Sequence, residues 1–365
     1  MDTDIKQWIY DNAIQRGDNN IATRHLQPTS RSLYEFDNMF QTGSRNFVLP
    51  KGSEIRCYGC DKIVKKTHGN YIFSCIKCGK MFEKYRYFYT SQKDKIAVVT
   101  GARTKLGHQI CLKLLRAGAT VIGTTRYPEK AVSIYKSYPD FPVWSSRLSI
   151  HALDFDIDNM NKSILNFIEG LAIERVDILV NCAAQTIRSR EKNVADIPSQ
   201  SDTNRYGDPK YTTETEINSW NMKIGDYTQH EMEELFRINS VGPVLLTQAL
   251  MPLLQKAKKP YLINVHAKEG LFDVCKTESH IHTNMSKASL AMFTRCMARA
   301  RSRNKVSVHG CDPGWISIDE YDLGESPWIV PPLDEIDGAA RILFPLWKNL
   351  NSCPKTRRHF DILTY

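Results

Sequence analysis

The chain has 365 residues, of which 42% are hydrophobic, and a formal net charge of +9. This length suits one large α/β domain with a smaller appendage. No window approaches 18 consecutive apolar residues, and the N-terminal stretch is polar and of mixed charge, so the sequence predicts neither a membrane span nor a signal peptide. We therefore expect a soluble, cytoplasmic protein whose scattered cysteines are reduced core residues.

Residues 1–50 are expected to form an N-terminal leader. They combine short amphipathic pieces, such as residues 4–14, with stretches rich in Ser, Asn and Gly, and they contain no repeat. Basic residues outnumber acidic ones over the first 95 positions, a balance that suits nucleic acid or another acidic partner. Because these basic residues form no dense run, a solvated and mildly basic surface explains them more simply.

Residues 51–92 are expected to form a small zinc ribbon. They contain two CxxC pairs, whose members are Cys57, Cys60, Cys75 and Cys78. Each pair forms a tight turn that presents two thiolates to one tetrahedral ion, and Gly59 and Gly79 occupy positions where such turns bend most sharply. Four cysteines fill the coordination sphere of zinc, so we expect a structural ion rather than a catalytic one. A module of about 40 residues buries little apolar surface, so metal binding contributes folding free energy.

The remaining residues of this ribbon alternate between apolar or aromatic and polar types. The alternation predicts short antiparallel strands, including one through residues 85–89. The aromatic residues at 85–89 also resemble a stacking platform for single-stranded nucleic acid. A strand that buries one face explains them more simply, so we do not expect nucleic-acid binding. His68, between the CxxC pairs, is expected to be a surface loop residue rather than a further ligand.

From residue 93 to 365 the pattern is that of a Rossmann-type α/β domain. Apolar, β-branched runs alternate with helical stretches, as expected for the buried parallel strands of a doubly wound sheet. The predicted helices include residues 160–170, 231–255 and 284–300. A polar insertion at 188–228 is too long for an ordinary connection, and we expect it to border the substrate cleft.

The first strand of this domain ends in a turn typical of dinucleotide binding. The apolar run 95–100 leads into TGARTKLG at 100–107, and a predicted helix follows. The free N–H groups and the dipole of a helix N-terminus attract a pyrophosphate. Arg126 stands about where NAD-binding sites place an acidic residue for the ribose hydroxyls. With Arg103 and Lys105 it would accept a 2′-phosphate instead, so the sequence predicts NADP rather than NAD.

Several motifs in the expected order make the chain from Lys95 onwards resemble the short-chain dehydrogenase/reductase family. The family's TGxxxGxG turn resembles 100–107, with Lys105 in place of the middle glycine, and its NNAG motif resembles NCAA at 181–184. Its acidic residue near the adenine, the asparagine of its fifth helix and its PG turn near the nicotinamide resemble Asp154, Asn239 and Pro313-Gly314. The cofactor contacts implied by the turn and the resemblance are Gly101, Arg103, Lys105, Leu106, Gly107, Arg126, Asp154, Asn181, Ala183, Lys287, Pro313 and Gly314.

The same resemblance locates the catalytic positions, two of which have lost the family's residue. In the family, the tyrosine of YxxxK is the general acid, the lysine lowers its pKa and holds the ribose, and an upstream serine orients the carbonyl. Lys287 matches the lysine, whereas Thr283 stands in place of the tyrosine and Ala267 in place of the serine. The chain therefore resembles an atypical branch of the family. The resemblance implies Lys287, Asn239 and Thr283 as catalytic positions, and His282, which adjoins Thr283, is a further candidate.

Three histidines adjoin the two lost residues. A threonine hydroxyl is far less acidic than a phenol of pKa ~10, so it is a poor general acid at neutral pH. His280 and His282 flank the position of the lost tyrosine, and His266 adjoins that of the lost serine. Imidazole titrates near neutrality, so any of them could transfer the proton; alternatively, each is an ordinary surface or core histidine.

Two functions follow from these patterns. The first is an NADP(H)-dependent oxidoreductase that acts on an unidentified carbonyl or alcohol. The second is a catalytically inactive dinucleotide-binding protein that acts as a binding or regulatory module and holds a protein partner through the zinc ribbon. The sequence indicates no membrane partner, and it identifies neither a small-molecule substrate nor an oligomeric state.

Overall fold

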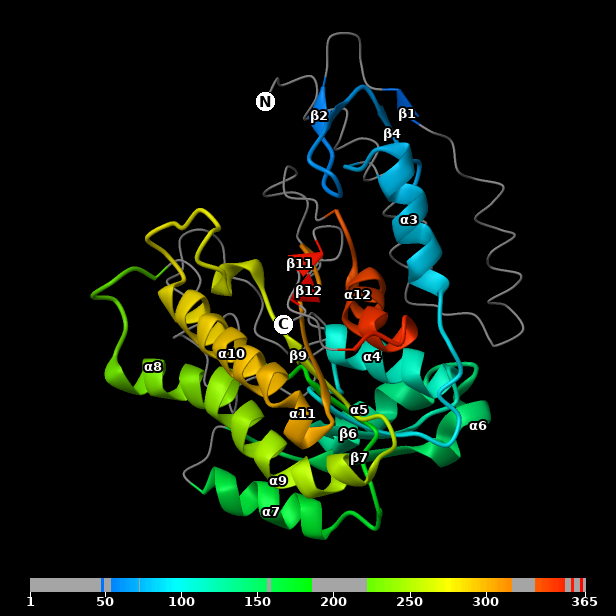
Figure 1. Cartoon of the computed structure of the whole chain (residues 1–365), viewed down its shortest axis with the longest axis vertical. Helices are drawn as coiled ribbons and strands as arrows, with labels where there is room; N and C mark the ends of the chain where they lie inside the picture. The colour runs from blue at the N-terminus through cyan, green and yellow to red at the C-terminus, as the bar shows by residue number, and fades with distance from the viewer. Residues whose placement is uncertain are drawn as a thin grey trace.

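The computed structural model of the chain describes residues 47–48, 54–71, 73–155, 159–185, 222–316, 332–351, 356–357 and 362–363. Most of the leader expected at 1–50 and most of the insertion expected at 188–228 lie outside the described residues. Among the residues that are described, no helix is long and apolar enough to cross a membrane. Figure 1 shows the N-terminal elements, from β1 to α3, at one end of a larger α/β domain.

An eight-stranded sheet forms the centre of this domain, in the order β11-β12-β10-β9-β8-β5-β6-β7. Its parallel strands are β5 (Ile96–Thr100), β6 (Thr120–Thr125), β7 (Leu148–Ala152), β8 (Ile178–Asn181), β9 (Tyr261–Val265) and β10 (Ser307–Cys311). The short strands β11 (Thr356–Arg357) and β12 (Ile362–Leu363) add antiparallel pairs at one edge. The order reverses between β5 and β8, where a doubly wound sheet opens a crevice beyond its strand ends. The predicted Rossmann-type fold is confirmed.

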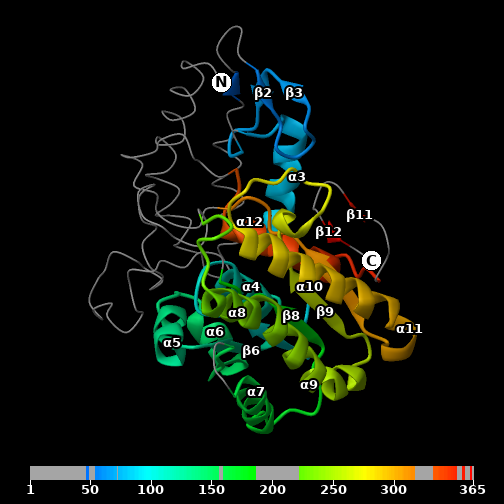
Figure 2. The same cartoon turned by 90° about the vertical axis from the view of Figure 1, so that its left-hand side faces the viewer.

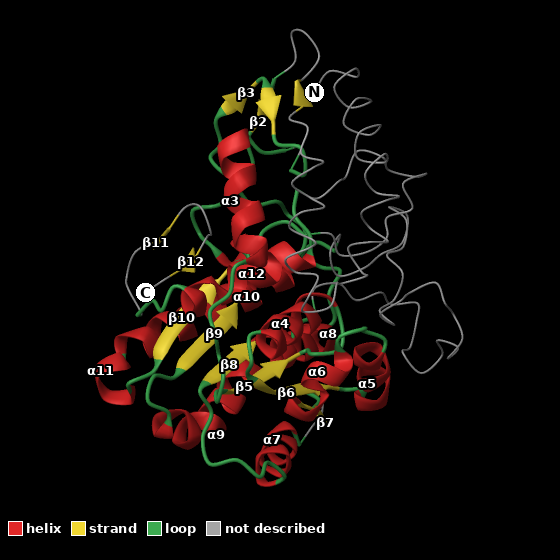
Figure 3. Cartoon of the chain, turned by 90° about the vertical axis from the view of Figure 1, so that its right-hand side faces the viewer, coloured by secondary structure: helices red, strands yellow, loops and turns green. Residues whose placement is uncertain are grey.

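Helices cover both faces of the sheet (Figures 2 and 3). On one face, α4 and α12 join a buried core with residues such as Leu112 and Leu343. On the other, α7, α9 and α10 contribute residues such as Ile164, Leu250 and Ala298 to a second core. The helices of the domain are α4 (Lys105–Arg116), α5 (Pro128–Lys136), α6 (Phe141–Trp144), α7 (Met160–Glu169), α8 (Gln229–Phe236), α9 (Gly242–Lys256), α10 (Ile281–Arg299), α11 (Arg301–Asn304) and α12 (Glu335–Trp347).

The helix predicted at 231–255 is interrupted by a π-helical turn. It begins at a capping box in which Thr228 and Glu231 bond each other's backbone N–H groups. The turn η3 (Arg237–Val241) separates α8 from α9 and carries the buried Asn239. Single π-helical turns inside α-helices occur frequently at functional sites. The π-helical turn therefore marks Asn239 as a candidate functional residue.

The N-terminal module combines short strand pairs with one helix. β1 (Phe47–Val48) pairs with β4 (Lys66–Thr67), β2 (Ile55–Arg56) pairs with β3 (Ile63–Val64), and α3 spans Ile76–Tyr87. The strand predicted through 85–89 is wrong, because residues up to Tyr87 belong to α3. The buried residues of that helix include Cys78, Phe82 and Arg86, spaced four residues apart. This helical spacing coexisted in the sequence with an alternating pattern, and the alternation was the misleading signal.

Buried ion pairs join the N-terminal module to α12. Arg86 Nη1 lies 2.7 Å from Asp334 Oδ1 and 2.9 Å from Asp337 Oδ1, with all three side chains less than a tenth exposed. Tyr71 donates its hydroxyl proton to the same oxygen of Asp337 at 2.8 Å. Asp334 is also the N-cap of α12 and accepts from two backbone N–H groups. The module is therefore attached at the beginning of α12 by groups that satisfy one another inside the protein.

We predict that Arg86→Ala lowers the free energy of unfolding by about 3–5 kcal/mol, because it leaves two carboxylates buried without their counter-ion. Urea denaturation followed by circular dichroism measures this. The matched control is Arg56→Ala, whose ion pair with Asp61 has side chains that are 64% and 79% exposed; we expect a loss within about 1 kcal/mol. Similar losses in both variants would contradict the assignment of the buried pair.

Candidate functional site

The turn after β5 is shaped by two glycines. Gly101 has φ +73°, and a Cβ placed on it would lie 3.0 Å from Ala183 Cα. A Cβ on Gly107 would collide with the carbonyl oxygen of Gly101. Thr100 Oγ1 accepts from the backbone N–H groups of Cys182 and Ala183, each at 2.9 Å, and so joins the ends of β5 and β8. The sequence-predicted glycines and Ala183 therefore meet at the point where the strand order reverses.

Lys105 is expected to occupy the position of the family's middle glycine, and its backbone conformation is one that suits glycine. Its φ is +49°, in the left-handed region that side chains other than glycine rarely adopt. Holding a lysine there costs about 1–2 kcal/mol. Lys105 is also the first residue of α4, followed directly by the buried Leu106 and Gly107. Lys105 therefore begins the helix next to the turn despite an unfavourable backbone conformation.

A group of basic side chains surrounds Tyr127, just after β6. The charged ends of Arg103, Arg126 and Lys130 lie 5.2, 5.6 and 5.5 Å from the centre of its ring. Arg103 is buried, whereas Arg126 and Lys130 are exposed. The sequence had identified the two arginines but not Lys130, which lies in the first turn of α5. The structure thus brings together positive charge suited to an anionic group.

Asp154 and Asn181 follow the ends of two other strands. Asp154 comes two residues after β7 and is partly buried. Asn181, the last residue of β8, donates from Nδ2 to Asn264 Oδ1 at 2.8 Å and to Thr247 Oγ1 at 3.1 Å. The side chain of Asn181 is thus held within the domain, where it joins β8 to β9 and α9.

Asn239, in the π-helical turn, holds the chain that follows β8. Its Oδ1 accepts from the Gln185 backbone N–H at 2.7 Å, and its Nδ2 donates to the Gln185 carbonyl at 2.9 Å. The same Nδ2 donates to Ser286 Oγ of α10 at 3.3 Å. Asn239 therefore fixes the segment after β8 against the helix that carries the predicted catalytic residues.

Lys287 is buried in α10, where its Nζ donates to the Val265 carbonyl at 3.0 Å. Burial lowers its pKa below the ordinary value. A Cβ on Gly270 would lie 2.6 Å from the Lys287 carbonyl carbon, so the turn η4 (Lys268–Gly270) packs tightly on α10. Ala267 immediately precedes that turn and offers no hydroxyl. Ala267, expected to occupy the position of the family's serine, therefore lies beside the helix of Lys287.

Thr283, His282 and Tyr227 form one hydrogen-bonded row. Thr283 Oγ1 lies 2.8 Å from His282 Nε2, and His282 Nδ1 lies 3.1 Å from the Tyr227 hydroxyl. Thr283 and His282 are buried, whereas Tyr227 is half-buried. The row therefore runs from the buried Thr283, the position expected to match the family's tyrosine, to the half-buried Tyr227. Sequence reasoning missed Tyr227, although the capping box at Thr228 placed a helix start directly after it.

The other two histidines differ from His282 in their surroundings. His266 is buried, its Nε2 lies 3.0 Å from Thr294 Oγ1, and burial together with the charge of Lys287 lowers its pKa to about 3. It therefore stays neutral at physiological pH, and the expectation that it titrates near neutrality is wrong. His280 is the N-cap of α10 with φ +44°, and its backbone N–H donates to the Met222 carbonyl at 3.2 Å.

The predicted PG turn follows β10. Gly314 has φ +83°, and its N–H donates to Asp312 Oδ1 at 2.6 Å. A Cβ on Gly338 of α12 would lie 3.3 Å from Pro313 Cβ and 3.1 Å from Leu106 Cδ1. The PG turn and the first turn of α4 therefore pack against the same position of α12.

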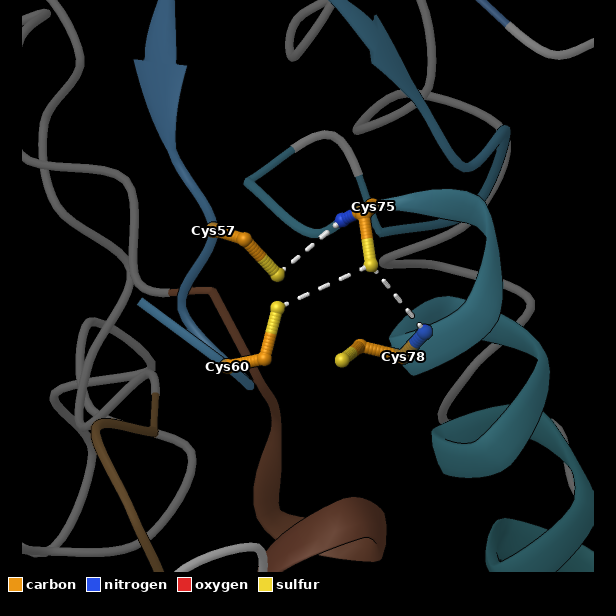
Figure 4. A group of neighbouring side chains, drawn as sticks. All are labelled: Cys57, Cys60, Cys75 and Cys78. Carbon is orange, nitrogen blue, oxygen red and sulfur yellow. Dashed lines mark hydrogen bonds between the residues drawn. The ribbon is translucent and has the colours of Figure 1, made fainter. Parts of the chain in front are cut away.

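The four cysteines of the two CxxC pairs converge (Figure 4). Their Sγ atoms all lie within 4.8 Å of one another, and Cys60 and Cys75 are 4.0 Å apart. Zn–S bonds of about 2.3 Å in a tetrahedron give S···S separations of roughly 3.8 Å, whereas a disulfide requires about 2.05 Å. The backbone N–H of Cys75 donates to Cys57 Sγ at 3.1 Å. This donor set fits one tetrahedral metal ion.

Close packing, rather than a sharp bend, explains the glycines of the CxxC pairs. A Cβ on Gly59 would lie 2.8 Å from Cys78 Cβ, and a Cβ on Gly79 would collide with the His68 side chain. Neither glycine has positive φ, unlike Asp61 in the first turn. His68 is only 2% exposed and lies 3.6 Å from Glu83 through Nε2. The expectation of a surface histidine is wrong, because the absent side chain of Gly79 makes room for its ring.

Comparisons with known proteins place this site in a family context. A family model described as short chain dehydrogenase matches residues 95–207 and 217–321. An uncharacterized protein of Acanthamoeba polyphaga mimivirus is 33% identical over 352 residues, covering 85% of this chain and 75% of the viral protein. The matched part of this chain is longer than residues 95–365, so the match includes residues before position 95. L-xylulose reductase of Caenorhabditis elegans is 24% identical over 239 residues, covering 65% of this chain and 77% of that reductase.

Solved structures support the same fold. A protein described as a short chain dehydrogenase from Escherichia coli CFT073, complexed with NADPH, has a TM-score of 0.51 at 18% identity, covering 70% of this chain and 89% of that one. The short chain dehydrogenase from Shigella flexneri also has a TM-score of 0.51 at 18% identity, covering 71% and 88%. At these identities the likeness bears on the fold alone.

Proposed function

This chain belongs to the short-chain dehydrogenase family, and on that premise we propose that it is an NADP(H)-dependent oxidoreductase that acts on a carbonyl or alcohol. The observation that carries the proposal is the row of Thr283, His282 and Tyr227 at the position of the family's proton donor. The row provides a path for a proton even though the family's tyrosine and serine are absent.

The residues at the strand ends fit NADP(H). A Cβ on Gly101 would crowd Ala183, so this glycine lets the ends of β5 and β8 approach closely, and α4 begins just after the turn. A helix N-terminus next to a close backbone approach suits a pyrophosphate. Arg103, Arg126 and Lys130 supply the charge for a 2′-phosphate, and Lys287 is proposed to hold the ribose.

When bound, the nicotinamide supplies a hydride for reduction or accepts one for oxidation. In reduction, the Thr283 hydroxyl donates its proton to the substrate oxygen as the carbonyl carbon gains the hydride. His282 gives its Nε2 proton to Thr283 and accepts another on Nδ1 from Tyr227. Tyr227 is half-buried and regains a proton from solvent. Alcohol oxidation runs the same transfers in reverse.

The relay keeps His282 neutral, which suits its environment. The imidazole is fully buried, and a charge there would be costly without a counter-ion. Passing the proton in at one nitrogen and out at the other changes only the tautomer. Partial burial raises the pKa of Tyr227, so the phenol stays protonated at neutral pH and can donate.

The absence of a hydroxyl at Ala267 favours a second candidate function. In that alternative the chain is a catalytically inactive dinucleotide-binding protein that acts through its zinc ribbon. The double variant Thr283→Tyr with Ala267→Ser distinguishes the oxidoreductase from the inactive binding protein. If the double variant reduces carbonyls that the unmodified protein does not, the natural chain is a binding protein.

We further propose that Cys57, Cys60, Cys75 and Cys78 bind one structural zinc ion. Cys60→Ser and Cys75→Ser should lose the ion and expose residues 54–90 to proteolysis. Elemental analysis of purified protein measures the metal. Cys275→Ser and Cys296→Ser are matched controls, since both thiols are exposed and lie outside the cluster; they should retain one zinc per chain. Full metal retention in Cys60→Ser or Cys75→Ser would exclude the site.

We predict tighter binding of NADP(H) than of NAD(H), because a charge-assisted contact to phosphate contributes on the order of 1.5–3 kcal/mol, or at least tenfold in affinity. Arg126→Asp should invert the preference, as measured by fluorescence titration of both reduced cofactors. Lys136→Asp makes the same charge change in the last turn of α5 and should preserve the preference. Equal affinity of the unmodified protein for both cofactors would refute the role of Arg126.

We predict that His282→Ala lowers kcat by about 10²–10⁴-fold and leaves cofactor affinity nearly unchanged, because it removes the relay and not the cofactor contacts. Tyr227→Phe should lower kcat as well, because it removes the hydroxyl at the half-buried end of the row. Lys287→Ala should instead weaken cofactor binding.

The assay measures kcat with NADPH and a panel of carbonyl compounds. His309→Ala, which removes a buried imidazole from β10, controls for general destabilisation; an intact rate in His282→Ala would refute the relay.

A further inference from the structure

We propose that Tyr58 couples the metal centre to the cofactor cleft by holding the turn that follows β10. This inference rests on the proposed function for the location of the cofactor. Tyr58 stands between the ligands Cys57 and Cys60, and its hydroxyl accepts from the Trp315 backbone N–H at 2.7 Å. Trp315 directly follows the PG turn. One hydrogen bond therefore joins the first CxxC pair to the chain beside the proposed nicotinamide position.

The contact between Tyr58 and the turn is closely fitted. A Cβ on Gly314 would lie 2.8 Å from the Tyr58 hydroxyl, so the turn has no room for a side chain at that position. The Tyr58 ring packs at 6.5 Å from that of Phe82 in α3, which in turn packs edge-on against Tyr71 at 5.5 Å. The aromatic packing fixes the ring from the side of the module, so the hydroxyl is presented to Trp315 in a defined position.

Apolar contacts run parallel to this hydrogen bond. Cys57, Cys78 and Phe82 form a buried cluster with Leu333, and Ile316 packs against it. Ile316 and Leu333 are joined by a parallel β-bridge. The cluster therefore combines two metal ligands with residues that follow the PG turn and precede α12. A displacement of the cysteines would disturb the same stretch of chain that Tyr58 holds.

The PG turn and the first turn of α4 pack on the same position of α12. Position 338 of α12 packs against Pro313, Ile316 and Leu106 at once, with 3.1–3.3 Å between an added Cβ and each of them. Arg341, one turn along α12, donates from Nε to the Asp312 carbonyl at 3.2 Å. The PG turn is thus held between α12 and Tyr58. Of these two supports, only Tyr58 depends on the metal directly.

The metal sets the position of Tyr58 because both neighbouring ligands belong to the same short turn. Within this turn the Asp61 N–H donates to the Cys57 carbonyl at 2.7 Å, and Asp61 itself has φ +62°. Metal–sulfur bonds stabilise such a turn against its unfavourable backbone. Coupling between two ligand sites is reciprocal, so each should raise the affinity of the protein for the other by the same factor. Zinc should strengthen NADPH binding, and NADPH should retard zinc loss.

The test compares Tyr58→Phe with Tyr71→Phe in the full-length protein. Both substitutions remove one hydroxyl from the same module, but Tyr71 donates to Asp337 and not to the turn. We expect Tyr58→Phe to keep its zinc and to bind NADPH about threefold to tenfold more weakly, the effect of one lost hydrogen bond. We expect Tyr71→Phe to keep its NADPH affinity within about twofold. Unchanged NADPH affinity in Tyr58→Phe would overturn the coupling.

Two further measurements separate this inference from the proposed function. Chelator-driven zinc release should be slowed by NADPH in unmodified protein and in Tyr71→Phe, but not in Tyr58→Phe. Amide hydrogen exchange of a peptide spanning 313–316, measured without cofactor, should be faster in Tyr58→Phe and after zinc removal. If unmodified protein binds no nicotinamide cofactor, the proposed function fails, whereas unchanged exchange at 313–316 defeats the inference about Tyr58.

Discussion

The buried contact of Arg86 with Asp334 and Asp337 is the interaction on which the arrangement of the molecule depends. It fixes the first turn of α12, and α12 contacts both the PG turn and the first turn of α4. A buried ion pair of this kind contributes little net stability compared with well-packed apolar groups. It does, however, penalise any other placement of the module, because each displaced partner would remain buried and unpaired. We interpret the contact as one that specifies where the cysteine-bearing module lies.

Two helices that carry predicted site residues begin with an unfavourable backbone conformation. Lys105 and His280 both have positive φ, and they stand at the first residue of α4 and the N-cap of α10. Such residues persist only where the surrounding structure holds them, and they are frequent at functional sites. For Lys105 a glycine would relieve the strain at no steric cost. We therefore interpret the lysine as contributing its charge, because it begins the helix next to the proposed pyrophosphate site.

The parts of the fold that could be predicted from sequence are those set by local patterns. Strands such as β8 are buried on both faces and appear as apolar runs, and the CxxC pairs carry their chemistry in their spacing. The structure added residues whose roles depend on distant partners. Tyr227 meets His282 across 55 positions, and Tyr58 meets Trp315 across 257. No periodicity or spacing encodes such contacts. The helix α3 was missed for a different reason, because its aromatic residues fitted two periods equally well.

If Thr283 stands in place of the family's tyrosine, as we propose, the consequences extend beyond one side chain. The side chain of tyrosine is long and its phenol is acidic. The side chain of threonine is short, and its hydroxyl is far less acidic. A site that retains Lys287 and loses the phenol therefore needs both a proton source and a connection to solvent. His282 and Tyr227 provide these two features separately: the imidazole contacts the hydroxyl, and the half-buried phenol contacts the imidazole. Tyr227 would then supply the proton that the phenol supplies in the family, and two hydrogen bonds would separate it from Thr283. The acid strength of the site would depend on the whole row, so the geometry at Tyr227, at the edge of the polar segment 188–228, would influence chemistry at Thr283.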